Sequence, residues 1–387
     1  CSSDLVEVFR SVLRASGEQG LIAHGSTTVK KGFAIHSDQS QQTVDQKYYK
    51  GVLSGESGPD LEAPSLESDT TFDGIVGSNG SLRAQIQLAK AAVSYPPHGL
   101  HTLIIGETGV GKSLLAEAMW RYGVESGVLR SSNRKSDPPF VIFSCADYAD
   151  NPQLLVSQLF GHAKGAFTGA TEEKEGLVDR AQGGILFLDE IHRLPPAGQE
   201  LLFTLIDKGI YRRLADTKER TANLMIIGAT SEDPQSALLT TFRRRIPVQI
   251  ELPKLKERPL NERMSLIVHF ISHESNRLNL PIFFSGRALR LFMSYDCQGN
   301  IGDLRNDLQL CCAKSYLSYL ASQGSLSRGH ENRSSESGGI VSEIGPSEES
   351  PILSVDIDAV PQKVYSAAQD IDLSGDPYID QALSEGV

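Results

Sequence analysis

Residues 103–113 read Leu-Ile-Ile-Gly-Glu-Thr-Gly-Val-Gly-Lys-Ser, and this stretch decides the fold. Its apolar start, 103–105, predicts a short buried strand that ends at Gly106, and the residues from Lys112 to about Tyr122 predict a helix. The loop between them matches the pattern GxxxxGK followed by Ser or Thr, in which glycines let backbone N–H groups surround a phosphate at a helix N-terminus. A chance glycine-rich turn is the alternative, but the strand before the loop and the helix after it argue against that alternative.

The loop therefore predicts a nucleotide site with ATP and Mg²⁺ as its cofactors. Lys112 would reach the β- and γ-phosphates, and the Ser113 hydroxyl would ligate Mg²⁺. The predicted nucleotide-binding residues are Gly106, Glu107, Thr108, Gly109, Val110, Gly111, Lys112 and Ser113.

A second apolar run, Ile185 to Leu188, ends in two acids, Asp189 and Glu190. Asp189 is predicted to hold Mg²⁺ together with Ser113, and Glu190 to polarise the attacking water. Acids after a strand commonly cap the next helix, so this pattern alone is weak. Because the acids follow the phosphate loop by about 75 residues, parallel connectivity would bring both strand ends to one edge of a sheet.

Short apolar runs at 103–105, 140–143, 184–188 and 224–228 alternate with helical patterns. This order predicts an α/β fold, a P-loop domain whose parallel sheet is sandwiched by helices. Beyond Pro253 the strand patterns stop. Amphipathic spacing from Leu260 to His273 then begins a predicted small, all-helical lid domain.

Composition divides the chain into five predicted segments. They are an N-terminal segment and linker with room for a remnant of a DNA-binding region (1–71), the α/β nucleotide-binding domain (72–255), the helical lid (256–321), a disordered linker rich in Ser, Gly and Glu (322–350), and the start of a further C-terminal region (351–387). The chain opens on Cys1 rather than Met, which is typical of a fragment of a longer protein.

Charge and composition exclude several classes of protein. The net charge of −11 disfavours a protein that coats nucleic acid by charge alone, so DNA would be bound only through a region not recognisable here. No apolar run approaches the roughly 20 residues that span a bilayer, so no membrane partner is expected. The five cysteines form no CxxC pair, which argues against a disulfide framework or a zinc site and favours the reducing cytoplasm.

The stretch Gly165-Ala166-Phe167-Thr168-Gly169-Ala170 shows neither helical nor strand periodicity. Two glycines bracket a Phe-Thr pair, a pattern typical of a flexible loop that presents an aromatic side chain to solvent. Exposure of Phe167 would forfeit roughly 1.5–3 kcal/mol that burial gives. The alternative, in which Phe167 packs into its own domain, stays open on physical grounds.

The longer run 159–170, Leu-Phe-Gly-His-Ala-Lys-Gly-Ala-Phe-Thr-Gly-Ala, resembles the signature of bacterial enhancer-binding proteins, the AAA+ activators of sigma-54 RNA polymerase. Within that family the chain is most similar to the levanase-operon-regulator type, which controls sugar phosphotransferase operons. The finer resemblance lies in residues 95–101, 145–148, 191–196 and 241–247. The resemblance covers residues 72 to about 320.

The resemblance implies an AAA+ ATPase that assembles into a hexameric ring with nucleotide between protomers. Hydrolysis would move the 165–170 loop against sigma-54 and remodel the closed promoter complex into an open one. By motif position, the sensor falls on Thr230 or Ser231. The arginine finger falls within 243–245, with Arg244 favoured and Arg245 second; a solvated basic run is the alternative.

Two positions depart from the family pattern. Ser144 stands where the family usually has an Asn that holds the catalytic Glu in a switched-off pose, and Gly302 stands where it usually has a sensor arginine, a role that Arg305 could take over. These departures leave open a nucleotide-gated interaction module with little hydrolysis. Another AAA+ remodelling ATPase is the third possibility, against which the 165–170 loop argues.

Overall fold

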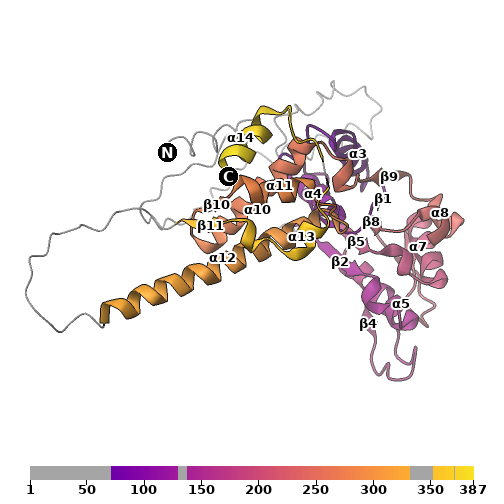
Figure 1. Cartoon of the computed structure of the whole chain (residues 1–387). Helices are drawn as coiled ribbons and strands as arrows, with labels where there is room; N and C mark the ends of the chain where they lie inside the picture. The colour runs from indigo at the N-terminus through magenta and orange to yellow at the C-terminus, as the bar shows by residue number, and fades with distance from the viewer. Residues whose placement is uncertain (1–70, 130–136, 332–351, 370) are drawn as a thin grey trace, which may run out of the picture.

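The computed structural model describes residues 71–129, 137–331, 352–369 and 371–387, and only the backbone of 322–331 (Figure 1). Within these ranges an α/β domain is followed by a lid. The predicted N-terminal segment, except for Thr71, and most of the predicted linker 322–350 lie outside the described residues.

A parallel sheet forms the centre of the α/β domain, and its order is β2-β5-β8-β1-β9. The strands are β1 (Thr102–Ile105), β2 (Phe140–Ser144), β5 (Ile185–Asp189), β8 (Met225–Thr230) and β9 (Val248–Glu251). The strands β1, β2, β5 and β8 confirm the four predicted runs. The edge strand β9 was not predicted, because its alternation of Val, Gln, Ile and Glu is too short to stand out from a loop.

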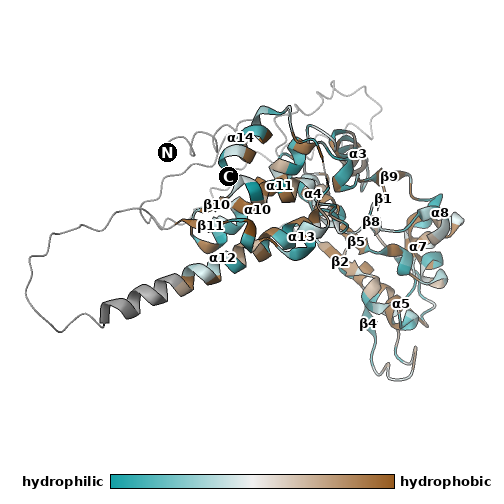
Figure 2. Ribbon diagram, in the orientation of Figure 1, coloured by the Kyte–Doolittle hydropathy of each residue, from teal (hydrophilic) through white to brown (hydrophobic). Residues whose placement is uncertain are grey.

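Helices cover both faces of this sheet, and successive strand residues therefore enter different cores. Ile104 and Phe187 pack with α3 and α4, whereas Leu103 and Leu188 pack with α5 and α7. The strands appear as a brown apolar layer between the helices (Figure 2). The helices of this domain are α3 (Arg83–Ser94), α4 (Lys112–Glu125), α5 (Pro152–Phe160), α6 (Leu177–Arg180), α7 (Pro196–Lys208), α8 (Pro234–Ala237) and α9 (Thr240–Arg243), with short turns η1 (Ala146–Tyr148) and η2 (Ile191–Arg193).

Two small hairpins extend from the end of the α/β domain that lies away from the lid. One joins β3 (Gly161–His162) to β4 (Lys174–Glu175), and the other joins β6 (Ile210–Tyr211) to β7 (Arg220–Thr221). Each hairpin forms a two-stranded sheet of its own, separate from the central sheet. The 165–170 loop is therefore placed at the tip of the domain (Figure 1).

The lid differs from the predicted all-helical domain. Its helices are α10 (Leu260–Leu278), α11 (Gly286–Ser294), α12 (Asn300–Glu331), α13 (Gln362–Ser366) and α14 (Pro377–Glu385), with the turns η3 (Leu255–Glu257) and η4 (Ile357–Ala359). A two-stranded parallel sheet of β10 (Ile282–Phe284) and β11 (Leu353–Val355) lies among them. Because β11 belongs to 351–387, the lid is completed by residues that composition assigns to a further region.

The buried core of the lid also contains side chains from the segment 352–387. Val355, Val364 and Leu383 are buried in one cluster with Phe284, Phe292 and Leu308 of the central lid elements. The helix α12 also continues to Glu331, into the segment expected to be a linker. Among the described helices, none combines the length and the apolarity that a membrane span requires.

Candidate functional site

The phosphate-type loop 106–113 connects β1 to α4. Gly111, which precedes the helix, has a φ of +105°, and no side chain among the described residues caps α4. Gly109 has a φ of +81°, and a Cβ there would lie 2.1 Å from the carbonyl oxygen of Gly299. An uncapped helix N-terminus without acidic residues in its first turn attracts anions. The loop therefore fits the phosphates of a nucleotide.

Lys112 lies at the centre of this loop and is buried. Its Nζ donates to the carbonyl oxygens of Gly106 at 2.8 Å and Glu107 at 3.2 Å. Burial lowers the pKa of the Lys112 ammonium, and the charges of Glu190 and Asp189 oppose that shift. The lysine is thus held by neutral carbonyl oxygens, which a phosphate oxygen could replace with a stronger interaction.

The two predicted acids follow β5, which is separated from β1 by β8. The Glu190 Oε1 lies 3.8 Å from the Lys112 Nζ, so the loop and the acids form one site as predicted from parallel connectivity. Burial, and then the charge of Glu190, raise the pKa of Asp189. Two adjacent carboxylates offer the oxygen ligands that a divalent cation such as Mg²⁺ prefers, and the ion would be held by Asp189 and by Ser113, which is exposed on the first turn of α4.

Glu190 itself has an unusual backbone, with a φ of 49°. This left-handed conformation costs a non-glycine residue about 1–2 kcal/mol. Its Oε2 accepts hydrogen bonds from the Ser231 hydroxyl at 2.7 Å and the Ser231 N–H at 3.3 Å. The sensor candidates at the end of β8 are thus brought to the carboxylate. Within the described residues, Ser144 makes no hydrogen bond to Glu190.

The three adjacent arginines at the end of α9 differ in their surroundings. Arg245 forms an ion pair with Asp207 at 3.2 Å and stacks its guanidinium over the ring of Phe203. Arg243 lines a cleft of about 750 Å³ that also contains Gly106 and Ser231. The Arg244 side chain is exposed, and no described residue forms a hydrogen bond or ion pair with that side chain. Of the two finger candidates, Arg244 is thus the one whose side chain has no polar partner among the described residues.

An apolar pocket beside the phosphate loop was not predicted. It lies between the α/β domain and the lid, and its lining includes Ile75, Val76, Val110, Phe270 and Ile301. Such a pocket next to a phosphate site suits the flat apolar face of a nucleotide base. The five named residues come from four separate stretches of sequence, and only Val110 lies in a recognised motif.

The lid contacts the phosphate loop through main-chain atoms and one amide. Asn300 donates from Nδ2 to Glu107 Oε2 at 3.2 Å and to the Thr108 carbonyl oxygen at 3.1 Å. The Gly302 N–H donates to the Gly109 carbonyl oxygen at 3.1 Å. Gly302 thus joins the lid to the loop without a side chain, and Arg305 is exposed.

The predicted partner loop is closed by its own backbone. The Gly165 N–H donates to the Ala170 carbonyl oxygen at 2.8 Å, which brings the two ends of the loop together. The Phe167 ring is half-buried and meets the His162 ring edge-on, with centroids 4.9 Å apart. Phe167 is therefore neither fully exposed nor part of the core. Thr168 beside it is exposed.

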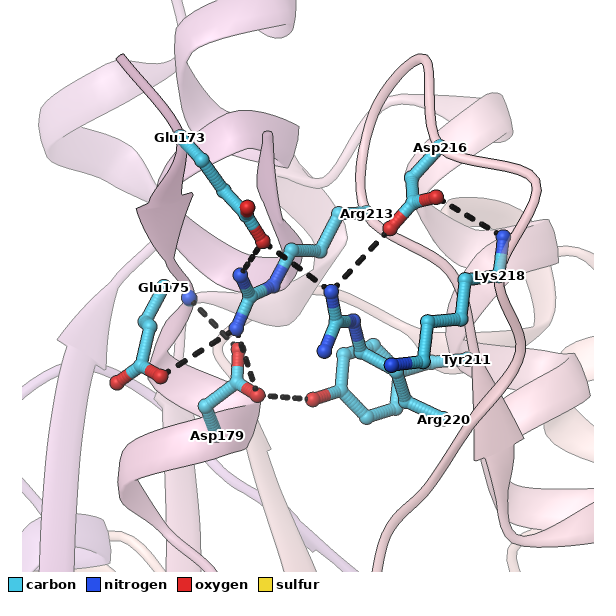
Figure 3. A network of polar contacts seen from close by, with 9 residues as sticks. Glu173, Glu175, Asp179, Tyr211, Arg213, Asp216, Lys218 and Arg220 are labelled. Atoms are coloured by element: carbon cyan, nitrogen blue, oxygen red, sulfur yellow. Dashed lines mark hydrogen bonds and ion pairs between the residues drawn. The ribbon is translucent and has the colours of Figure 1, made fainter. Parts of the chain in front are cut away.

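An ion-pair network fastens the base of this loop to the neighbouring hairpin (Figure 3). Arg213, only 5% exposed in its side chain, contacts Glu173 and lies 3.2 Å from Asp179 and 3.5 Å from Glu175. Tyr211 also donates to Asp179. Burial alone would raise the pKa of Asp179. The hydrogen bonds to its carboxylate and the charge of Arg213 outweigh burial, so the pKa of Asp179 is lowered. The 161–175 and 210–221 hairpins are thus joined at their bases.

Comparison with known proteins agrees with this arrangement. Residues 75–256 match the family of the Sigma-54 interaction domain. The sequence is 50% identical over 244 residues to the transcriptional regulatory protein LevR of Bacillus subtilis, and 45% identical over 253 residues to the transcriptional regulatory protein DagR of Salmonella typhimurium. These alignments cover 63% and 65% of this chain, and 26% of each relative.

A solved structure shows the same fold. NtrX from Brucella abortus in complex with ADP superposes with a TM-score of 0.54 at 17% identity, over 86% of this chain and 62% of that chain. Taken with the sequence matches, this identifies residues 75–256 as a sigma-54 interaction domain, with an AAA+ P-loop fold. The chain spans about a quarter of the length of LevR and DagR.

Proposed function

We propose that this chain hydrolyses ATP and uses the reaction to remodel sigma-54 RNA polymerase as a transcriptional activator. The observation that carries the proposal is the approach of Lys112 to Glu190, 3.8 Å apart, beside an uncapped helix N-terminus. A phosphate-binding cation and a carboxylate able to accept a proton from water are thereby placed in one site. The similarity to the levanase-operon-regulator type supports a role at promoters of sugar phosphotransferase operons.

Each site residue has a role in this proposal. Lys112 and the loop N–H groups hold the phosphates, Glu190 orients and deprotonates the attacking water, and Ser231 contacts the terminal phosphate from the end of β8. Mg²⁺, when bound by Ser113 and Asp189, neutralises charge on the phosphates. The apolar pocket between the domain and the lid takes the base.

The active form is a homo-oligomeric ring, which we propose to be a hexamer in the cytoplasm. Arg244 is exposed and unpaired within the described part of its own chain, so it is free to reach the nucleotide of a neighbouring protomer. An arginine at the γ-phosphate accelerates phosphoryl transfer by roughly 10³–10⁵. Contact with DNA would come through parts of the protein outside the residues described.

The 165–170 loop is the proposed contact with sigma-54. Phe167 rests against a single ring rather than in a core, so its release would cost little apolar burial. Positive φ angles at Gly165 and Gly169 provide hinges at both ends of the loop.

Two measurements test this function. ATP turnover by the purified chain, with Glu190→Ala as the inactive control, separates a motor from a module that only binds nucleotide. Binding to sigma-54 in the presence of ADP–aluminium fluoride separates a sigma-54 activator from another AAA+ machine. Absence of turnover, or turnover without sigma-54 binding, would reject the corresponding half of the proposal.

A further inference from the structure

The loop 74–82, which leads into α3, is fastened to the lid by a buried carboxylate. Glu262 lies in the first turn of α10 and is 8% exposed. Its Oε1 accepts a hydrogen bond from the Ser81 N–H at 2.7 Å, and its Oε2 accepts one from the Ser81 hydroxyl at 2.6 Å. Hydrogen bonds to an ionised acceptor are roughly twice as strong as those between neutral groups. A side chain of the lid therefore holds this loop through both of its oxygens.

Two glycines of the loop leave room for the carboxylate. A Cβ at Gly80 would collide with the Glu262 Oε1, and a Cβ at Gly77 would lie 2.7 Å from the Oε2. The φ of Gly77 is +91°, a conformation that other residues rarely adopt. The Gly77 carbonyl oxygen accepts from the N–H groups of Gly80 and Leu82, both at 2.9 Å. The loop is thus a turn built around the carboxylate.

The same loop forms one wall of the apolar pocket that takes the nucleotide base in the proposed function. Ile75 and Val76 both line this pocket, but Ile75 packs against the core of the α/β domain and Val76 against the core of the lid. The Val76 carbonyl oxygen also accepts from the Arg258 Nη1 at 3.2 Å. The position of this wall therefore depends on contacts with the lid.

The helix α10 provides another wall of the pocket. Leu266, His269 and Phe270 line the pocket and follow Glu262 at spacings of four, seven and eight residues. These spacings place the four side chains on one side of a helix. One helix thus carries three lining side chains and the acid that fixes the opposing loop, so a shift of the loop relative to α10 would change the shape of the pocket.

We propose that Glu262 is a positioning residue for the nucleotide base: by holding Ser81, it keeps the loop 74–82 in place as a wall of the pocket. The inference rests on the proposed function, because it concerns the same nucleotide site. A preformed pocket spares the base the cost of ordering the loop. Loss of Glu262 should therefore weaken the contribution of the base to binding. The contribution of the phosphates, which the separate loop 106–113 would hold, should remain.

The test compares ATP with inorganic tripolyphosphate, which carries phosphates and no base. Calorimetric titration with Mg²⁺ gives the ratio of the two affinities for each variant. Glu262→Ala should lower the preference for ATP about tenfold, the scale of one charge-assisted hydrogen bond, and leave the affinity for tripolyphosphate within about twofold. Ser81→Ala should lower the preference about threefold, because the N–H of residue 81 still donates. Glu262→Gln should restore most of the preference, since its amide can accept from the Ser81 N–H and donate to the Ser81 hydroxyl.

Glu274→Ala is the matched control. Glu274 is a buried acid of the same helix, paired with Arg277 at 2.9 Å, and it is not among the residues that line the pocket. This variant measures what the loss of an acid does to the lid alone. An equal fall in preference in both Ala variants, or an unchanged preference in Glu262→Ala, would overturn the role of Glu262. If Glu262→Ala does not fold, an unchanged preference in Ser81→Ala overturns it.

The outcome for Glu262 is distinct from the outcome for the proposed function. If the unchanged chain binds ATP no more tightly than tripolyphosphate, the pocket does not take the base, and this inference is rejected with it. If the unchanged chain prefers ATP but does not hydrolyse it, the proposed ATPase activity fails. The comparison of affinities then still decides whether Glu262 positions the wall of the pocket.

Discussion

At the scale of single residues, the three arginines at 243–245 illustrate how neighbours in sequence acquire different roles. Arg245 is occupied by Asp207 and Phe203, and Arg243 points along the cleft beside Ser231. Arg244 and Arg245 are both exposed, but only the Arg244 side chain has no hydrogen-bond or ion-pair partner among the described residues. Sequence alone could not separate them, because the difference comes from side chains contributed by α7 and β8.

We predict that Arg244→Ala subunits mixed with Glu190→Ala subunits recover part of the ATP turnover that each lacks alone. Each variant then supplies the group that the other is missing across a subunit boundary. Turnover is measured against mixing ratio. Arg245→Ala is the matched control and should retain most activity while losing some stability. A mixture as inactive as its components would contradict action of Arg244 between subunits.

At the scale of elements, the hairpin at the tip of the domain carries the proposed contact with sigma-54. The 165–170 loop is closed by its own hydrogen bonds, and Phe167 rests on His162. His162 is fixed in turn by a hydrogen bond between its Nδ1 and the Ser157 hydroxyl at 2.8 Å. The loop thus has a rigid support and a lightly held tip.

We predict that Phe167→Ala abolishes binding to sigma-54 and leaves ATP turnover within about twofold of the unchanged chain. The reason is that Phe167 belongs to the tip loop, where its ring meets His162, and is not among the residues of the nucleotide site. Pull-down of sigma-54 with ADP–aluminium fluoride and a turnover assay check both halves. Lys164→Ala, exposed on the same loop, serves as the control. Equal loss of both properties would reject the role assigned to the loop.

The Arg213 network predicts a large effect on stability. Arg213→Ala should lower the free energy of unfolding by roughly 3 kcal/mol, because Asp179 would lose its main charged partner in a partly buried site. Arg212→Ala is a matched control: its pair with Glu219 is exposed on both sides and should cost less than about 1 kcal/mol. Denaturant unfolding of both variants gives the comparison, and equal losses would contradict the network's importance.

The contribution of this network to the free energy of unfolding depends on pH. The pKa of Asp179 is lowered in the folded chain from its ordinary value of 3.8. Its stabilisation is therefore present above pH 3.8 and is lost as the pH falls through the lowered value. The difference in unfolding free energy between the unchanged chain and Arg213→Ala should shrink in that acidic range, as measured by unfolding at several pH values.

At the scale of the whole molecule, the lid depends on a distant part of the chain. The strand β11 completes the β10 sheet, and α14 packs on α11. The Val387 N–H also donates to the Phe284 carbonyl oxygen at 2.8 Å. The lid in turn touches the phosphate loop through Asn300 and Gly302. The C-terminal segment thus packs on the same lid that contacts the phosphate loop.

We predict that Leu383→Ala in α14 lowers the free energy of unfolding of the lid by about 2–5 kcal/mol, the usual range for a buried leucine. Tyr378→Ala, exposed on the same helix, should cost much less. Thermal unfolding and hydrogen exchange of β10 measure the effect. If both variants behave alike, residues 352–387 are not an integral part of the lid.

The sequence by itself determined the α/β class, four of the five central strands and the meeting of Lys112 with Asp189 and Glu190. These features follow from apolar runs and glycine spacing within short stretches of sequence, and from the order in which strands and helices alternate. The tertiary structure alone decided that Arg245 and not Arg244 is paired with Asp207, that Ser231 bonds to Glu190, where an apolar pocket forms beside the phosphate loop, and that β11 and α14 complete the lid. These features arise from contacts between stretches far apart in the chain, and no local periodicity or motif records which side chains will meet.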